Sequence, residues 1–202
     1  MLDWNRVGSF SPGQKEVLGR ILSQSDLLTG KVNDLIEIAE LDSGSTMNLS
    51  LEEADPLNAV MAVLPRVEQR RVHKGIMIEP VVERQIPKIR SNQEALEKIF
   101  FHLIDNAVKF GRTKGTVSIL FNQVQDSLHI VVADDGIGMS NSHLQMIFDA
   151  FYQVDNQLDR HYEGMGVGLT IIKKQIEATG GRVEVVSELG KGSSFTVIYP
   201  LA

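Results

Sequence analysis

Cysteine is absent from this sequence, which excludes disulfide bonds and thiol chemistry and is typical of a protein in the reducing cytoplasm. No apolar run approaches the roughly 18 residues needed to cross a bilayer, and the amino terminus lacks the pattern of a signal peptide. Positive charge is scarce as well, with 20 Lys and Arg against 26 Asp and Glu. The net charge of −6 disfavours a nucleic-acid surface, which usually shows as a basic stripe. The remaining composition, 43% hydrophobic and 23% charged, predicts a globular protein without membrane or nucleic-acid contact.

A long helical pattern runs from about Gln14 to Leu41. Its apolar residues recur at intervals of three, four or seven, which places them along one stripe: Val17, Ile21, Leu28, Val32, Leu35 and Ala39. So long a stripe needs a cover, either the chain's own domain or the other helices of a bundle, missing here or supplied by a second copy. The composition changes after this helix, and we divide the chain into residues 1–45 and 46–202.

The second unit alternates helices and strands. Strands are predicted at residues 47–51, 76–78, 87–90, 116–121, 127–133, 182–186 and 194–199. Helices are predicted from Asp55-Pro56 onward, at 91–110 with a Ser91/Glu94 capping box, and at 142–148 and 166–179. This order predicts an α/β two-layer sandwich, a mixed sheet with helices on one face, preceded by the long N-terminal helix.

One polar face of the helix predicted over 91–110 carries candidate chemistry. His102 and Asn106 are four residues apart and share this face, and Lys109 follows one turn later. An asparagine oxygen suits magnesium, which takes few protein oxygens together with phosphate and water. Lys109 supplies a positive charge for phosphate oxygens. Taken alone, the same pattern is equally typical of an ordinary surface face.

A second candidate segment follows the apolar strand Val131–Ala133. Asp134 and Asp135 enter a turn there, and Gly136 and Gly138 permit positive φ and close approach of the backbone to a ligand. A calcium loop is disfavoured because further oxygen ligands at alternate positions are absent. A P-loop is disfavoured because no Lys-Ser or Lys-Thr follows the glycines.

The third segment, with glycines at 164, 166 and 168, opens a helix whose free N–H groups form an anion site. A dinucleotide fingerprint would need a strand directly before it. The polar residues 155–163 predict a loop instead, which disfavours hydride transfer. Three such segments in this order indicate a nucleotide site.

The order of the segments resembles the catalytic ATP-binding domain of sensor histidine kinases. This domain belongs to the GHKL superfamily, with gyrase, mismatch-repair ATPases and a heat-shock chaperone. The corresponding boxes are the N box at 102–109, the first glycine box at 134–138, the F box at 147–155, the second glycine box at 164–169 and a closing glycine segment at 190–195. The resemblance covers about residues 47–201, and the helix over 14–43 resembles the second helix of the dimerisation and phosphoacceptor domain.

The resemblance implies that ATP and Mg²⁺ bind along these boxes. Asp134 would accept a hydrogen bond from the adenine amino group, with Gly136 and Gly138 closing around the base. Asn106 would hold magnesium and Lys109 a phosphate, so we assign His102, Asn106 and Lys109 to the catalytic set.

The second glycine box would complete the nucleotide site. Gly164, Gly166 and Gly168 would shape a lid hinge and present N–H groups to the phosphates, with Val167 and Leu169 between and after them. Arg160 would take over the phosphate contact of an F-box arginine.

Several positions depart from the family pattern. Gln153 replaces that arginine, and Met165 stands where threonine is common. His102 stands where superfamily members that hydrolyse ATP have a glutamate that activates water. Transfer to another acceptor is therefore favoured over hydrolysis.

The usual phosphoacceptor, a histidine followed by an acidic residue, is also missing from the sequence. We therefore expect a fragment that binds ATP without labelling itself. The parent would transfer the γ-phosphoryl to a histidine of its own phosphoacceptor helix, act as a homodimer and pass the phosphoryl to a response regulator receiver domain. It would be cytoplasmic, with or without a membrane anchor. Two alternatives are a catalytically weak regulatory module that binds another kinase, and an ATPase that drives a conformational clamp, disfavoured by His102.

Overall fold

The computed structural model describes residues 10–42, 50–82, 85–153 and 166–201. Its elements, in chain order, are α1 (Pro12–Asp42), β1 (Glu52–Ala54), α2 (Pro56–Lys74), β2 (Met77–Val81), β3 (Ile89–Ser91), α3 (Gln93–Phe110), β4 (Thr116–Val124), β5 (Ser127–Asp134), α4 (Asn141–Leu144), α5 (Gly168–Ala178), β6 (Arg182–Glu188) and β7 (Gly192–Pro200).

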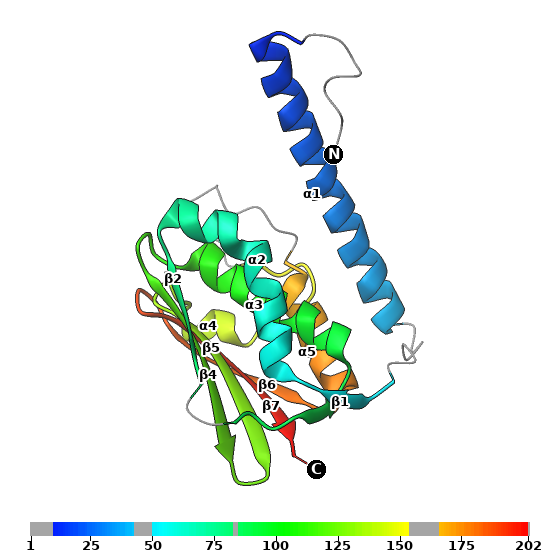
Figure 1. The fold of residues 1–202 in the computed structure, drawn as a ribbon, viewed down its shortest axis with the longest axis vertical. Coiled ribbons are helices and arrows are strands. Elements are labelled where there is room, and N and C mark those ends of the chain that lie inside the picture. The colour runs from blue at the N-terminus through cyan, green and yellow to red at the C-terminus, as the bar shows by residue number, and fades with distance from the viewer. Residues whose placement is uncertain (1–9, 43–49, 83–84, 154–165, 202) are drawn as a thin grey trace.

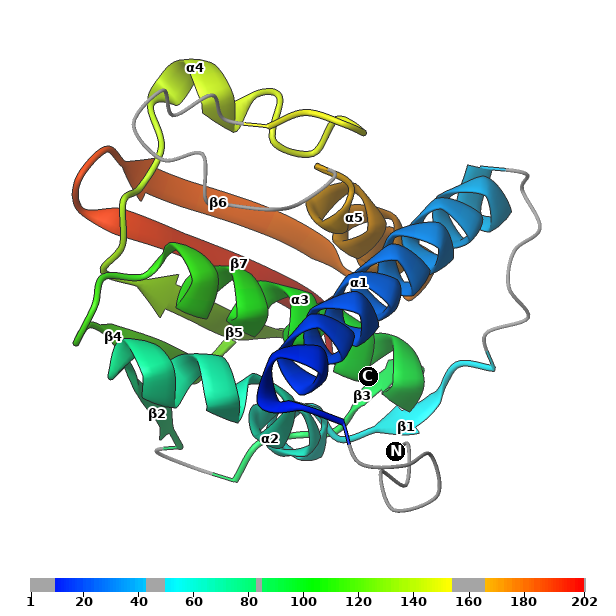
Figure 2. The same ribbon diagram turned by 90° about the horizontal axis from the view of Figure 1, so that it is seen from above.

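Five of the strands form one mixed sheet in the order β2-β4-β5-β7-β6. Only β2 and β4 run parallel, and every other neighbouring pair in this sheet is antiparallel. Strands β1 and β3 pair separately as a small antiparallel ribbon. Helices α2, α3 and α5 cover one face of the large sheet (Figures 1 and 2). The predicted two-layer sandwich is confirmed.

The core lies between the sheet and the helices. On α3, Ile99, Phe100, Leu103 and Ile104 are almost fully buried, and they pack in one cluster with residues of α2 and of the sheet. Burial of each such side chain contributes about 1.5–3 kcal/mol. These residues recur on one side of α3, and their burial fixes which side of the helix faces the core. The other side, with His102 and Asn106, is therefore only half-buried.

The starts of α2 and α3 show where local signals succeed and fail. Asp55 caps α2 as predicted, because its carboxylate accepts the Asn58 N–H at 3.1 Å. The predicted Ser91/Glu94 capping box is wrong. Asn92 caps α3 instead, accepting the Ala95 N–H at 3.0 Å. Ser91 is unavailable because it is a fully buried strand residue paired with Glu52.

Other boundaries also differ from the expectation. Residues 47–49 of the strand predicted over 47–51 lie outside the described residues, and pairing begins at Glu52. The helix predicted over 142–148 is shorter, because α4 ends at Leu144 and continues as tight turns. Strands β4 and β5 are longer than predicted, because Gln125 adopts a φ of 52° and the hairpin turns within two residues.

Helix α1 extends beyond the sandwich (Figure 1) and leaves its apolar stripe exposed. Val17, Ile21 and Leu28 are 55%, 58% and 63% exposed. Among the α1 side chains that the structure describes, the chain's own domain buries Ile38, near one end of the helix, against Val167 and Ile171 of the α5 region. The stripe could be covered by the chain's own domain or by other helices of a bundle, and the chain's own domain covers very little of it. Over the described ranges, no helix combines the length and apolar character that a membrane span requires.

Candidate nucleotide-binding site

The first glycine box lies against the C-terminal end of α3. The Ile137 N–H donates to the Phe110 carbonyl oxygen over 3.2 Å. Gly136 packs on the same oxygen, since a β-carbon built on Gly136 would lie 2.2 Å from it. Phe110 is about one helical turn beyond Asn106. The carboxylate-glycine segment and the Asn106–Lys109 face therefore meet at one end of one helix.

Asp134 and Asp135, although adjacent, have different environments. One oxygen of the half-buried Asp134 carboxylate accepts the Gly136 N–H at 2.9 Å, which leaves lone pairs for a ligand. Burial raises the pKa of Asp134, hydrogen bonds from the backbone of Gly136 and Ser193 lower it, and the charge of Asp135 raises it. Asp135 instead accepts the Thr116 N–H at 3.2 Å and ties the end of β5 to the start of β4. Asp134 is the carboxylate suited to an adenine amino group.

The glycines of this segment are required mainly by the protein's own backbone. Gly138 has a φ of 63°, and a β-carbon there would lie 2.0 Å from the Glu188 carbonyl oxygen. Gly192 has a φ of 101°, and its β-carbon would lie 1.9 Å from the Asp134 carbonyl oxygen. Gly136 does not have the expected positive φ and is needed for space beside Phe110. Close packing between segments thus explains these residues before any ligand is considered.

The turn between β6 and β7 holds the first glycine box from its other side. The Gly190 N–H donates to the Ile137 carbonyl oxygen over 2.7 Å, and the Arg112 guanidinium donates to the Gly190 carbonyl. The Met139 N–H donates to Ser187 Oγ over 2.8 Å. Sequence reasoning missed Arg112 and Ser187, and only the resemblance of residues 190–195 to a closing glycine segment pointed to this region.

The described part of the second glycine box, residues 166–169, meets the middle of α3 at Gly168. Helix α5 begins at Gly168, where a β-carbon would lie 3.6 Å from His102 Nδ1. Val167 precedes the helix, and its apolar side chain cannot accept a hydrogen bond from the first-turn N–H groups. Val167 is buried beside Ile38, its carbonyl oxygen accepts the Ile171 N–H, and Leu169 packs on the main core.

The chain on either side of residues 154–165 is joined by hydrogen bonds. The Phe151 N–H donates to the Gly166 carbonyl oxygen over 3.0 Å, and Gly166 has a φ of 70°. Thr170 Oγ1 donates to the Phe148 carbonyl oxygen over 2.9 Å. Arg160, Gly164 and Met165 lie outside the described residues, so the assignments made for them stay predictions.

The N-box side chains provide one neutral oxygen and one cation. Asn106, Lys109 and His102 are each half-buried, and the His102 ring lies edge-on to Phe101 with 5.6 Å between centroids. Within the ranges described, no group of three His, Asp or Glu residues could hold a metal. A lone amide oxygen fits a magnesium ion that takes most of its ligands from phosphate and water.

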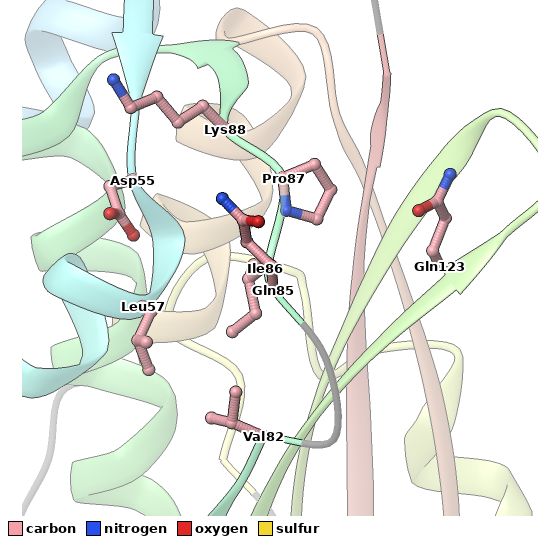
Figure 3. A pocket seen from close by; sticks show the side chains of 8 residues that line it. All are labelled: Asp55, Leu57, Val82, Gln85, Ile86, Pro87, Lys88 and Gln123. Atoms are coloured by element: carbon pink, nitrogen blue, oxygen red, sulfur yellow. The ribbon is translucent and has the colours of Figure 1, made fainter.

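A surface cavity of about 640 Å³ lies elsewhere, near the start of α2 (Figure 3). Its lining residues are Asp55, Leu57, Val82, Gln85, Ile86, Pro87, Lys88 and Gln123. None belongs to the boxes, and Asp55 is engaged in capping α2. This cavity is therefore distinct from the candidate nucleotide site.

Comparison with known proteins agrees with this geometry. Residues 91–202 match the family described as "Histidine kinase-, DNA gyrase B-, and HSP90-like ATPase". An uncharacterized sensor-like histidine kinase of Rhizobium meliloti is 30% identical over 93% of this chain and 35% of its own length. The circadian input-output histidine kinase CikA of Synechococcus elongatus is 28% identical over 99% of the chain and 26% of its own length. The sensor protein SrrB of Staphylococcus aureus is 30% identical over 92% of the chain and 32% of its own length.

A solved structure is similar over nearly the whole chain. Full-length ShkA in complex with AMPPNP superposes with a TM-score of 0.82 at 30% identity, over 96% of this chain and 40% of ShkA. The chain thus spans about a third of the length of the relatives it matches.

The fold and these matches define an ATP-binding domain of the kind found in histidine kinases. The chain belongs to the family of histidine kinase-, DNA gyrase B- and HSP90-like ATPases.

Proposed function

We propose that this chain is the ATP-binding region of a two-component sensor histidine kinase, and that it presents the γ-phosphoryl of Mg²⁺-ATP to a histidine outside the chain. The observation that carries the proposal is the meeting of the boxes on α3. Phe110 contacts the first glycine box through Ile137, and His102 lies beside Gly168 of the second. The family match and the AMPPNP complex of ShkA support ATP as the nucleotide.

In the proposed mechanism the chain's residues mainly bind and orient. Asp134 accepts the adenine amino group, and the first-turn N–H groups of α5 receive phosphate oxygens. Lys109 neutralises phosphate charge. The acceptor imidazole nitrogen forms a bond to the γ-phosphorus while the bond to the β–γ bridging oxygen breaks, ADP leaves, and the imidazole loses its proton. Such transfer requires positioning and charge neutralisation more than covalent chemistry by the protein.

Asn106 would hold the magnesium ion, which would neutralise part of the phosphate charge. The neighbouring His102 carries no fixed negative charge comparable to a carboxylate that activates water. We propose that the site therefore favours transfer over hydrolysis, and that Arg160 and Gly164 add phosphate contacts.

Calorimetric titration of the chain with a non-hydrolysable ATP analogue tests the proposal. We expect magnesium-dependent binding, and at an analogue concentration of 100 times Kd the chain gains about 2.7 kcal/mol of stability. A well-folded sample whose melting temperature does not change with the analogue would rule the proposal out. A peptide of the phosphoacceptor helix, which lies outside this chain, should become phosphorylated when it is added. The chain alone should remain unlabelled.

We further propose that α1 is the second helix of the dimerisation and phosphoacceptor domain, within the unit formed by residues 1–45. Its exposed apolar stripe supports a homodimer of the parent, with the stripe covered by the other helices of a four-helix bundle. A response regulator receiver domain would then take the phosphoryl group onto an aspartate. We place these reactions in the cytoplasm, where ATP is available.

A further inference from the structure

Lys74, the last residue of α2, makes an unusual set of contacts with the end of α3. Its ammonium group donates to the carbonyl oxygens of Val108, Lys109 and Gly111, over 3.2, 2.5 and 3.1 Å. An ammonium group has three donors, and all three find acceptors at one helix end. The positive charge of Lys74 also interacts favourably with the negative, C-terminal end of the α3 dipole.

With these bonds, each carbonyl oxygen from Ala107 to Gly111 at the C-terminus of α3 has a hydrogen-bond donor. The last carbonyls of a helix have no partner within the helix. The Ala107 oxygen receives the Gly111 N–H at 2.8 Å, and the Phe110 oxygen receives the Ile137 N–H. Lys74 supplies the donors for the carbonyls that remain between and after them. The last turn of α3 is thus held by the first glycine box on one side and by Lys74 on the other.

Lys74 is itself fixed in place. Its carbonyl oxygen accepts the Lys114 N–H at 2.8 Å. Gly75 follows in the left-handed conformation, with a φ of 66°, and ends α2. Helix α2 packs along α3, so the anchoring residue and the turn it holds belong to two packed helices. Burial lowers the pKa of Lys74, as does the charge of Arg70, and the carbonyl oxygens compensate for the loss of water around the ammonium group.

We propose that Lys74 is a positioning residue for the nucleotide, which holds the turn of α3 that carries Asn106 and Lys109 and that receives the first glycine box at Phe110. The proposal rests on the proposed function, because it assigns the held turn to ATP binding. Lys74 acts through the carbonyls it binds, and no contact with ATP is required of it. None of the sequence boxes includes this residue.

The test compares three variants of the full chain with the wild type. Lys74→Met removes all donors at nearly constant size, Lys74→Arg keeps the charge and several donors, and Lys98→Met removes an exposed lysine elsewhere on α3. Two quantities are measured: the Kd for AMPPNP with Mg²⁺ by calorimetry, and amide hydrogen exchange at Ile137 and at Ile130 of the core strand.

We expect Lys74→Met to raise Kd about tenfold and to speed exchange at Ile137 but not at Ile130, since hydrogen bonds from a charged donor are lost at one helix end. Lys74→Arg should stay within about threefold of the wild-type Kd, because the guanidinium keeps donors for these carbonyls. Lys98→Met should match the wild type in both measurements.

Unchanged Kd and unchanged Ile137 exchange in Lys74→Met would overturn the proposal. A uniform rise in exchange at Ile137 and Ile130, without rescue by Lys74→Arg, would overturn it too, because that pattern marks a purely structural role. If Lys74→Met does not fold, Lys74→Gln replaces it, and a wild-type Kd with wild-type Ile137 exchange in that variant overturns the proposal. If the wild type binds no nucleotide, the proposed function fails, while exchange at Ile137 still reports whether Lys74 holds the turn.

Discussion

At the scale of single residues, neighbouring side chains of one type serve different purposes. Asp134 remains half-buried with lone pairs available, whereas Asp135 accepts a backbone N–H and joins two strands. Burial makes the charged form of Asp134 costly, and its raised pKa records that cost. A group that is expensive to keep charged in the folded chain is expected at a binding site.

Asp134→Asn should bind ATP at least about tenfold more weakly, because its one amide oxygen is taken by the Gly136 N–H and its NH2 group then faces the adenine amino group. Asp135→Asn is the matched control and should stay within about threefold of the wild-type Kd, since it keeps an oxygen for Thr116. Calorimetry with an ATP analogue measures both. Equal affinities for the wild type and Asp134→Asn would remove Asp134 from the site.

The same Asp134→Asn variant should be more stable than the wild type at neutral pH. The carboxyl binds its proton more tightly in the folded chain, so its contribution to stability is present below the ordinary pKa of 3.8 and is lost as pH rises through the raised pKa. The amide does not titrate. The melting temperature of the variant minus that of the wild type should therefore grow as pH rises from 3.8 upward and then level off. A constant difference would contradict this account.

The glycines at the β6–β7 turn provide a comparison between backbone strain and steric clash. Gly190 and Gly192 both have positive φ, but a β-carbon on Gly190 meets nothing within 4 Å, whereas one on Gly192 meets the Asp134 carbonyl at 1.9 Å. Gly190→Ala should cost about 1 kcal/mol of unfolding free energy, and Gly192→Ala about 3 kcal/mol or more. Urea denaturation measures both, and equal losses would show that strain alone explains the glycines.

At the scale of elements, α3 is central to the molecule because one face packs in the core and the opposite face contacts the candidate nucleotide site. One face is buried in the core, and the other borders both glycine boxes. Helix α5 connects the second box to α1, since Val167 and Ile171 bury Ile38. A shift of α1 is therefore expected to reach the start of α5, where phosphate oxygens are proposed to bind.

Ile38→Ala should weaken the packing of α1 on α5 by about 2 kcal/mol, because it removes most of a side chain that is buried against Val167 and Ile171. Amide exchange at Ile171, whose N–H donates to Val167 over 3.0 Å, should become faster. Ile36→Ala is the control, since Ile36 is 51% exposed on the same helix. If the control has the same effect as Ile38→Ala, the specific contact is not what holds α1.

At the scale of the whole molecule, the apolar stripe of α1 is the feature that the fold of this chain leaves exposed to solvent. Val32 and Leu35 are 47% and 42% exposed, and with Val17, Ile21 and Leu28 they form one apolar face. Contiguous exposed apolar surface of this kind marks an interaction site. We propose a second copy of the chain as the partner that covers this face.

Sedimentation should show self-association of the chain that Leu28→Glu weakens at least about tenfold, because a carboxylate placed in the seam must be desolvated. Asn33→Glu, which adds the same charge at an exposed position of α1 away from the stripe, should leave association within about threefold. A wild-type chain that stays monomeric at high concentration would contradict the assignment of α1 to a dimer.

Several parts of this protein could be predicted from short stretches of sequence. The Asp55-Pro56 start of α2, the buried spacing of α3 and the apolar alternation of β5 depend on neighbours a few residues away. The boxes were recognisable for the same reason, since each is a local pattern around Asn106, Asp134 or Gly166.

Only the tertiary structure decided which distant residues contact the residues of these local patterns. Ser91 became a strand residue through pairing with Glu52, and Gly192 is needed because Asp134, far away in sequence, passes beside it. Lys74 gave no signal because its acceptors lie on another helix. Local periodicity is set by bonds between near neighbours, whereas these contacts form only when packing brings distant segments together. The sequence therefore determined which helices and boxes exist, and the packing of α2, α3 and the β6–β7 turn decided which atoms hold them in place.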